Sequence, residues 1–308
     1  MISQEALNKN MIRLRVPLWI LNRSTPIHPQ IDRGSLSLLF DSKKINITKQ
    51  AKPGTPTLVF IALDLVGSPT ISKTTKLALS YQIQQMGPEY WVCLISAQES
   101  ITVIQSPTND KQLLQDKIYE TNQIGKAGLL ESIQALMDLS SSVLNQTDIR
   151  VLVLLVTDSD AKNYRNDYEN PTVNDSDDQD LSRRFVGRKL QEDISRLSEV
   201  ILTFAVPLVV VHVGPEDDDL NLIYRRGLIQ LAKTVGGHVL TSKSVGDIPH
   251  TFQEAFNWIN NSFVIDCVVP RREKRGPFSI KIKLESSVQS KVNLSYPTRL
   301  FLPLESQK

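Results

Sequence analysis

The strongest constraint on the fold is a set of three nearly unbroken apolar runs in the middle of this 308-residue chain. They cover 57–64 (TLVFIALD), 150–158 (RVLVLLVTD) and 207–214 (PLVVVHVG). A strand that is buried on both faces has this continuous pattern, whereas a half-exposed strand alternates. Segments with apolar residues at helical spacing separate the runs, so strands and helices take turns. The sequence therefore predicts a doubly wound α/β fold, with a mostly parallel sheet and helices on both faces.

The remaining elements of this α/β region follow from the same periodicities. Further helices are predicted at 75–86, 110–120, 127–144, 187–205, 222–237 and 248–263, and further strands at 90–96, 100–106 and 238–242. The segment 161–188 is polar and has few apolar residues, so we predict a long surface loop there.

The two ends of the chain have a different pattern. Residues 278–285 (FSIKIKLE) alternate apolar and polar side chains, which is typical of an antiparallel strand with one wet face. Neither end has enough strands to be stable alone. We therefore predict one small β-layer built from both ends. The predicted division is an N-terminal β segment at 1–54, an α/β domain at 55–265, and C-terminal strands at 266–308 that pack with the N-terminal segment.

Composition narrows the classes of partner and compartment. The formal net charge is +2, so no basic field predicts a nucleic-acid partner. The longest apolar stretch, 200–214, is shorter than the ~20 residues of a membrane span, and we predict no transmembrane segment. The first residues lack the pattern of a secretory signal. Cys93 and Cys267 both lie in apolar runs and are predicted to be free, buried thiols.

The sequence lacks the common catalytic motifs. It contains no H-E-x-x-H, G-x-S-x-G or C-x-x-C. The GKAG at 125–128 lacks the other residues of a phosphate-binding loop, and the turn after 57–64 lacks the glycines of a dinucleotide site. His212 lies inside an apolar strand and is interpreted as a core residue. We therefore predict no enzymatic activity, no catalytic residue and no cofactor.

Two carboxylates follow predicted parallel strands at the point where each strand ends. Asp64 closes the run 57–64, and Asp158 closes the run 150–158. Ligands of doubly wound sheets bind beyond the carboxyl ends of the strands, where the winding reverses. Asp64 and Asp158 are therefore the first candidates for a functional site, together with Ser68 in the turn after Asp64.

The order of these motifs resembles that of a von Willebrand factor A domain, over about residues 55–265. The turn DLVGS at 64–68 resembles the family's D-x-S-x-S, and TD followed by Ser159 resembles its T-D-G. Residues 124–139 resemble the segment that opens its third helix, and 206–242 its fifth strand, next helix and closing Gly-Gly strand. With the β segments on either side, the chain looks like the bacterial "VWFA-related" proteins first noted in Acidobacteria.

This resemblance implies a magnesium or calcium site at the top of the sheet, in which this chain matches only part of the ligand set. Asp64, Ser68 and Asp158 match family ligands, whereas Val66 replaces a Ser and Lys126 replaces a Thr. We expect the Lys126 ammonium to take the place of the divalent ion between the two carboxylates. Two alternatives stay open: Lys126 points into solvent, or a shifted loop lets Thr121 or Ser68 restore a weak metal site.

The resemblance also implies a function. It predicts a protein-binding or scaffold protein whose partner meets the loops at 64–70, 124–128 and 158–186. The predicted partner-binding residues are Asp64, Ser68, Lys126, Asp158 and Ser159. The alternatives are a metal-dependent adhesion module and a structural subunit of a larger assembly. The family resemblance implies a periplasmic or secreted location if a signal has been removed, and a cytoplasmic one otherwise.

Overall fold

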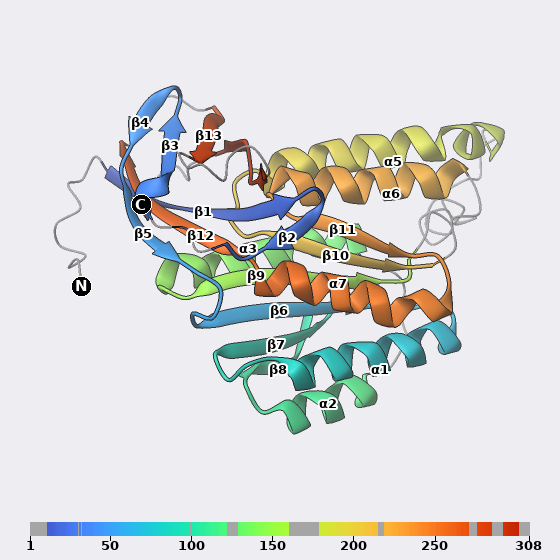
Figure 1. Ribbon diagram of the computed structural model, residues 1–308. Coiled ribbons are helices and arrows are strands. Elements are labelled where there is room, and N and C mark those ends of the chain that lie inside the picture. Colours follow the sequence, from blue (N-terminus) through green and yellow to red (C-terminus); the bar gives the residue numbers. More distant parts are fainter. Residues whose placement is uncertain are drawn as a thin grey trace, which may run out of the picture.

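The structure is a computed structural model that describes residues 11–29, 31, 33–98, 100–121, 129–159, 179–214, 219–270, 276–284 and 292–301. Within these residues the chain forms three β-sheets and three hydrophobic cores. One sheet, together with the helices, forms the α/β domain, and the other two sheets come from the two ends of the chain (Figure 1).

The sheet of the α/β domain has six strands in the order β8-β7-β6-β9-β10-β11. Their bounds are β6 Thr57–Asp64, β7 Tyr90–Ser96, β8 Thr102–Thr108, β9 Arg150–Thr157, β10 Leu208–Val213 and β11 His238–Ser242. The edge strand β8 is antiparallel to β7, and the other neighbours are parallel. Numbered along the chain, the order is 3-2-1-4-5-6, which is a doubly wound order whose winding reverses between β6 and β9.

Helices cover both faces of this sheet, as the sequence predicted. They are α1 Pro69–Gln85, α2 Lys111–Glu120, α3 Leu129–Gln146, α5 Gln179–Ile201, α6 Asp219–Thr234 and α7 Ile248–Asn260, with a short 3-10 turn at Val245–Asp247. One core packs α3, α5 and α6 against the sheet, and a second core packs α1, α2 and α7 against the opposite face. In β6, Phe60 points into the first core and Ile61 into the second, which explains the continuous apolar run.

Two helices begin earlier than predicted. Helix α1 begins at Pro69 rather than at residue 75, because proline suits the first helical position, where its missing N–H is not needed. Helix α5 begins at Gln179, so the predicted loop at 161–188 is wrong for residues 179–188. Arg, Gln and Leu in that stretch are good helix formers, even though the stretch has few apolar residues. Residues 160–178 lie outside the described residues.

The two ends of the chain pair with each other, and they form two sheets rather than the single predicted layer. One sheet has the order β14-β1-β12-β5 with β2 paired to β1, and the other has the order β15-β13-β3-β4. The bounds are β1 Met11–Asn22, β2 Thr25–Ile27, β3 Leu36–Phe40, β4 Lys43–Ile45, β5 Ile47–Ala51, β12 Phe263–Pro270, β13 Phe278–Leu284, β14 Asn293–Ser295 and β15 Arg299–Leu300, with a 3-10 turn at Arg33–Ser35. We call these strands the sandwich.

The second sheet exists because β1 is buried on both faces. Val16 and Leu18 point into the core of the sandwich, together with Leu38 from β3 and Ile282 from β13. Trp19 points the other way, into the core of the α/β domain. The first sheet is therefore an inner layer between the α/β domain and the second sheet. Strand β12 runs across the predicted boundary between residues 265 and 266.

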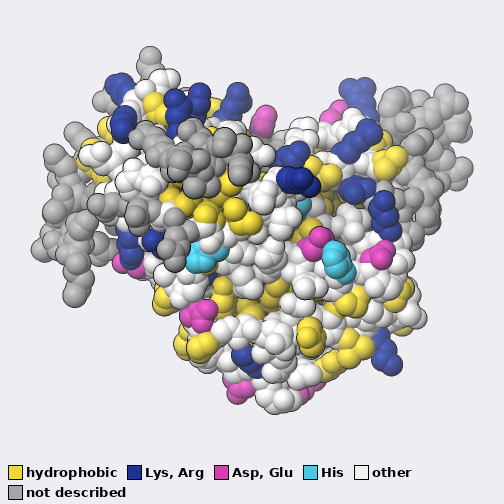
Figure 2. Space-filling view, in the orientation of Figure 1, with side chains coloured by type: hydrophobic (Ala, Val, Ile, Leu, Met, Phe, Trp, Pro, Cys, Tyr) yellow, Lys and Arg dark blue, Asp and Glu magenta, His cyan; other side chains and the backbone are white. Residues whose placement is uncertain are grey.

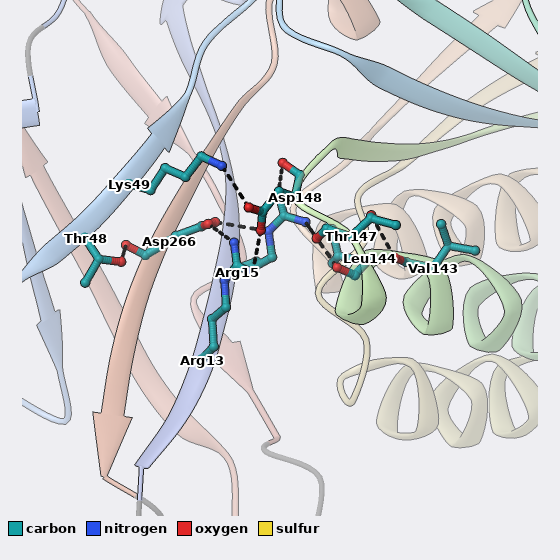
Figure 3. Close-up of polar contacts among 9 residues, drawn as sticks. All are labelled: Arg13, Arg15, Thr48, Lys49, Val143, Leu144, Thr147, Asp148 and Asp266. Carbon is teal, nitrogen blue, oxygen red and sulfur yellow. Dashed lines mark hydrogen bonds and ion pairs between the residues drawn. The ribbon is translucent and has the colours of Figure 1, made fainter. Parts of the chain in front are cut away.

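A charged network joins the sandwich to the α/β domain (Figure 3). Arg15 of β1 is only 4% exposed, and its Nε donates to Asp266 of β12 at 3.0 Å. Its other nitrogens donate to the carbonyl oxygens of Leu144, Thr147 and Asp148 at 3.1, 3.0 and 3.3 Å, where helix α3 ends. Arg15 thus supplies the hydrogen bonds that the last helical carbonyls lack.

Two exposed charges extend this network at its rim. Arg13 pairs with Asp266 and also with Asp148, the latter at 2.7 Å, and Lys49 lies 3.3 Å from Asp148. The hydrogen bond from Arg13 holds the pKa of Asp148 below its usual value. All these contacts lie at the end of the six-stranded sheet where its central strands begin, because Asp148 directly precedes β9.

An aromatic stack forms the second part of this junction. Trp19 Nε1 donates to the carbonyl oxygen of Trp258 at 2.7 Å, and the two ring centroids are 5.4 Å apart. The imidazole of His238 stacks on Trp258 at 4.1 Å with an interplanar angle of 9°. Burial lowers the pKa of His238 to about 4. The stack therefore favours an uncharged imidazole at neutral pH.

Both cysteines are free and buried, as predicted. Burial raises the pKa of Cys93 to about 11 and that of Cys267 to about 12, so neither thiol reacts readily at neutral pH. Among the helices that the structure describes, none is long and apolar enough to cross a membrane.

Candidate functional site

The structure brings Asp64 and Asp158 together at the point where the winding of the sheet reverses. Strands β6 and β9 are parallel neighbours, and their register places Asp64 beside Thr157. The backbone N–H of Asp158 donates to the carbonyl oxygen of Asp64 at 3.1 Å. We call Asp64, Thr157, Asp158 and Ser159 the switch-point cluster.

Asp64 is fully buried and accepts hydrogen bonds from two hydroxyls. The Oγ1 of Thr157 donates to its Oδ2 at 2.8 Å, and the Oγ of Ser159 donates to the same oxygen at 2.5 Å. The N–H of Ser159 donates in turn to Oγ1 of Thr157 at 3.0 Å. These bonds hold the turn after β9 against the end of β6.

Asp158 holds the turn after β6 through that turn's backbone. The N–H of Val66 donates to its Oδ1 at 2.7 Å, and the N–H of Gly67 donates to its Oδ2 at 2.8 Å. A Cβ at position 67 would lie 2.8 Å from that same Oδ2. Because real Cβ contacts are not that close, only glycine lets the backbone approach the carboxylate this closely.

A second set of contacts supports the cluster from below. His212 of β10 is buried, and its Nε2 lies 3.0 Å from the carbonyl oxygen of Ser159. Because a carbonyl oxygen only accepts, Nε2 is the donor in this contact. Gln98 donates to the carbonyl oxygen of Leu65 at 3.0 Å. His212 therefore acts as a buried positioning residue.

The other residues that the sequence singled out have different fates. Ser68 is exposed and precedes α1 without making a capping hydrogen bond to it. Val66 contributes only its backbone N–H to the cluster. The Oγ1 of Thr121 donates to the carbonyl oxygen of Lys117 at the end of α2. Lys126 lies outside the described residues, as does the rest of 122–128.

Sequence reasoning did not include Thr157 among the site residues. Its side chain joins Asp64 to the turn that carries Ser159. The sequence held a signal for it, because Thr157 is the polar residue that ends the apolar run of β9. Once β6 and β9 are taken as neighbours, residues 64 and 157 fall at the same level of the sheet.

An apolar pocket of about 270 Å³ lies at the same edge of the sheet. It is formed where β10 and β11 end and where α1 and α7 begin. Its main apolar walls are Ile71, Val213, Val245 and Ile248, and Lys243 lies at its rim. Two of its polar groups are already bonded within the chain, because Ser242 donates to Thr251 and Ser244 donates to Asp247, both at 2.8 Å. The pocket therefore offers mainly apolar surface.

Comparison with known proteins gave structural neighbours only. No family model matches the chain. No curated protein matches it either. Similar solved structures include von Willebrand factor A domains.

Three of these structures illustrate the range. The von Willebrand factor type A protein from Catenulispora acidiphila has 9% identity and a TM-score of 0.45, with 96% of this chain and 74% of that chain covered. The vWF domain of the type V pilus tip protein Mfa5 from Porphyromonas gingivalis has 12% identity and a TM-score of 0.47, with 68% and 96% covered. Proximal thread matrix protein 1 from the mussel byssus has 11% identity and a TM-score of 0.43, with 68% of this chain covered. This chain spans about half, 49%, of that matrix protein.

Proposed function

We propose that this protein is a non-enzymatic binding or scaffold module whose protein partner contacts the carboxyl edge of the six-stranded sheet, without a divalent ion. The observation that carries the proposal is the pairing of two features at one edge. The carboxylates of the switch-point cluster accept hydrogen bonds from the chain's own donors, and an open apolar pocket lies at the same edge.

The hydrogen bonds of the cluster argue against a directly bound divalent ion. Magnesium needs about six oxygen ligands in near-octahedral geometry. Both oxygens of Asp158 already accept backbone N–H groups, and position 66 offers no hydroxyl. Among the described residues, no group of three or more His, Cys, Asp or Glu could hold a metal ion. By the family resemblance, Lys126 supplies the positive charge at this edge instead.

The same contacts argue against a hydrolytic site in the cluster. Ser159 is fully buried and its hydroxyl donates to Asp64, so it is not presented to a substrate. The Nε2 of His212 is engaged by a carbonyl oxygen rather than by a nucleophile. The cluster fixes the shape of two turns, which suits a surface that is recognised by shape.

The pocket supplies what such a surface needs, namely a cavity for one apolar anchor. Anchor side chains buried in well-packed pockets carry most of the energy of protein–protein interfaces. The walls come from four elements that converge at one edge of the sheet, and Val245 at the pocket is 40% exposed. We propose that an aliphatic or aromatic side chain of the partner occupies it.

Site-specific cross-linking tests this proposal. A photoreactive amino acid placed at Val245 is expected to capture a partner protein from the native cell extract, and the yield is expected to be the same in magnesium and in chelator. The matched control is the same amino acid at Tyr81, which is 63% exposed on α1 and does not line the pocket. Equal capture from both positions would favour a structural subunit held by several faces. Capture that is lost in chelator would favour a metal-dependent adhesion module.

Calorimetry tests the absence of a metal separately. We expect no millimolar-range binding of magnesium, manganese or calcium to the wild type, and a gain in Lys126→Thr, which restores the hydroxyl of the family pattern. Lys126→Ala is expected to lower the free energy of unfolding by roughly 1–3 kcal/mol. Tight divalent binding by the wild type would disprove the metal-free part of the proposal.

A further inference from the structure

The small net charge of the chain conceals a strong asymmetry between its regions. Residues 1–54 and 266–308, which supply the sandwich, contain 18 Lys and Arg and only 7 Asp and Glu. Residues 55–265 contain 17 Lys and Arg and 26 Asp and Glu. Such a division of charge within one chain is typical of a protein that uses its basic part on a polyanion or an anionic surface.

Part of this positive charge lies on one outward face of the four-stranded sheet. In β13 the side chains alternate, so that Lys281 and Lys283 are exposed while their neighbours point into the core of the sandwich. The register places Lys281 beside Leu39 and Leu39 beside Lys44, which puts Lys44 on the same face. Arg299 pairs with the outward residue Ser279. We call Lys44, Lys281, Lys283 and Arg299 the basic face.

The cations of the basic face form no ion pair among the residues that the structure describes. By contrast, Arg13, Arg15 and Lys49 of the sandwich pair with Asp148 or Asp266 at the junction. One carboxylate, Asp41, lies beside the face and accepts from the N–H of Ser279 at 2.9 Å. Figure 2 shows Lys and Arg side chains gathered over the region where Figure 1 draws β3, β4 and β13.

Sheet geometry keeps these cations close together. Residues two apart on a strand are about 7 Å apart, and neighbouring strands are about 5 Å apart. Lys281 and Lys283 therefore lie within a Debye length of each other, which is about 8 Å at physiological salt. Their mutual repulsion lowers stability unless an anion is near, so the face is suited to an anionic partner.

We propose that the basic face docks the protein on an anionic membrane surface. A sheet face is broad and slightly twisted, so that all four cations can approach a planar bilayer at once. Three of the four are lysines, which act on anionic surfaces as hydrated point charges rather than as bidentate ligands. The large apolar side chains exposed in the described part of the chain lie on other elements, so the basic face lacks the aromatic platforms on which nucleic-acid bases stack.

This docking fits the placement of the other surfaces. The sandwich joins the α/β domain at the end of the six-stranded sheet where the central strands begin, through Arg15 and helix α3. The switch-point cluster and its neighbouring pocket lie at the opposite end, where the strands finish. In Figure 1 the sandwich and the arrowheads of β10 and β11 accordingly point to opposite sides. A chain held by its basic face presents the carboxyl edge of the sheet away from the bilayer.

Vesicle flotation tests the proposal independently of the proposed function. The full chain is expected to float with phosphatidylcholine vesicles that contain phosphatidylglycerol, and not with vesicles of phosphatidylcholine alone. Each cation near an anionic bilayer changes the partition coefficient about fivefold. Lys281→Gln with Lys283→Gln is therefore expected to reduce binding about 25-fold, and Lys281→Arg with Lys283→Arg to retain it. Added salt is expected to weaken binding of the wild type.

The matched control removes the same charge elsewhere. Lys73→Gln with Arg226→Gln changes exposed residues of α1 and α6, and is expected to leave vesicle binding within twofold of the wild type. Equal loss in this control would show that net charge rather than the basic face matters, and would overturn the proposal. Equal binding to uncharged vesicles, no binding to anionic ones, tighter binding to duplex DNA or RNA, or self-association that is lost in Lys281→Gln with Lys283→Gln would overturn it too.

Discussion

The molecule contains two buried polar groups that solve the same problem in different ways. At the junction, Arg15 meets Asp266 directly, and both are almost fully buried. At the switch point, Asp64 is equally buried, but the donors described for it are two hydroxyls, and those described for Asp158 are two backbone N–H groups. The junction thus pairs opposite full charges, whereas the described bonds of the switch point solvate carboxylates with neutral donors.

This difference matches what each region has to do. Arg15 connects three segments that lie far apart along the chain, namely β1, β12 and the end of α3. Removing one partner from a buried ion pair is costly because the other charge stays behind. Neutral donors can be replaced at lower cost, which lets a surface site change its ligands while the fold persists. The junction therefore suits a permanent connection, and the switch point suits a site whose partner varies.

The largest expected effect comes from breaking the junction. Arg15→Met keeps most of the buried stem but leaves Asp266 without its Nε donor and removes three bonds to the carbonyls at the end of α3. We expect the free energy of unfolding in denaturant to fall by about 3–5 kcal/mol. The matched control is Arg196→Met, an exposed arginine paired with Asp193, with a loss below about 1 kcal/mol. A small loss in Arg15→Met would mean that the sandwich and the α/β domain are held by apolar packing alone.

The next prediction concerns the aromatic part of the junction and its pH dependence. The pKa of His238 falls from 6.5 to about 4 on folding because the imidazole is buried. The unfolded chain binds the proton more readily, so this contribution to stability is complete above pH 6.5 and is lost as the pH falls towards 4. We expect a loss on the order of 2 kcal/mol across that window.

The comparison protein for this measurement is His238→Phe, which keeps a flat ring against Trp258. Denaturant unfolding of both proteins at several pH values isolates the contribution of the imidazole, because the other titrating groups are common to both. The wild type is expected to lose stability relative to the variant as the solution is acidified. Parallel curves would show that the imidazole is hydrated in the folded chain.

The switch point is predicted to respond less than the junction. In Gly67→Ala the added methyl meets Oδ2 of Asp158, so the carboxylate has to leave one of its two N–H donors. We expect a loss of about 1–2 kcal/mol in the free energy of unfolding. Gly276→Ala is the control, because a Cβ there has nothing within 4 Å. If the two variants are equally stable, the turn after β6 adapts, and the cluster does not fix its shape.

The sequence predicted the α/β domain better than the junction, and the reason is physical. Continuous apolar runs and helical spacing are local signals, so the strand at 90–96 was placed at its observed bounds, and Asp64 was placed at a strand end. The pairing of Arg15 with Asp266 spans 251 residues, and no local pattern records it. The double burial of β1 likewise depends on which surfaces it meets, so one predicted layer became two sheets. The small net charge concealed the basic face, because the charge of the sandwich is balanced elsewhere in the chain.

The smallest effect is expected at the rim of the junction, where the comparison can be made within one network. Asp148 pairs with Arg13 and Lys49, as Asp266 pairs with Arg13 and Arg15, but its side chain is 66% exposed. Water and salt screen such a pair, and most exposed ion pairs contribute little to stability. We expect Asp148→Asn to lower the free energy of unfolding by less than about 1 kcal/mol, and the difference from the wild type to vanish in high salt. Asp266→Asn, which removes a buried carboxylate from the same network, is expected to cost several times more and to resist salt, because solvent does not reach that pair. If both variants lose the same stability with the same salt dependence, burial is not what separates the two ion pairs, and the contrast between a permanent junction and an adaptable surface site loses its physical basis.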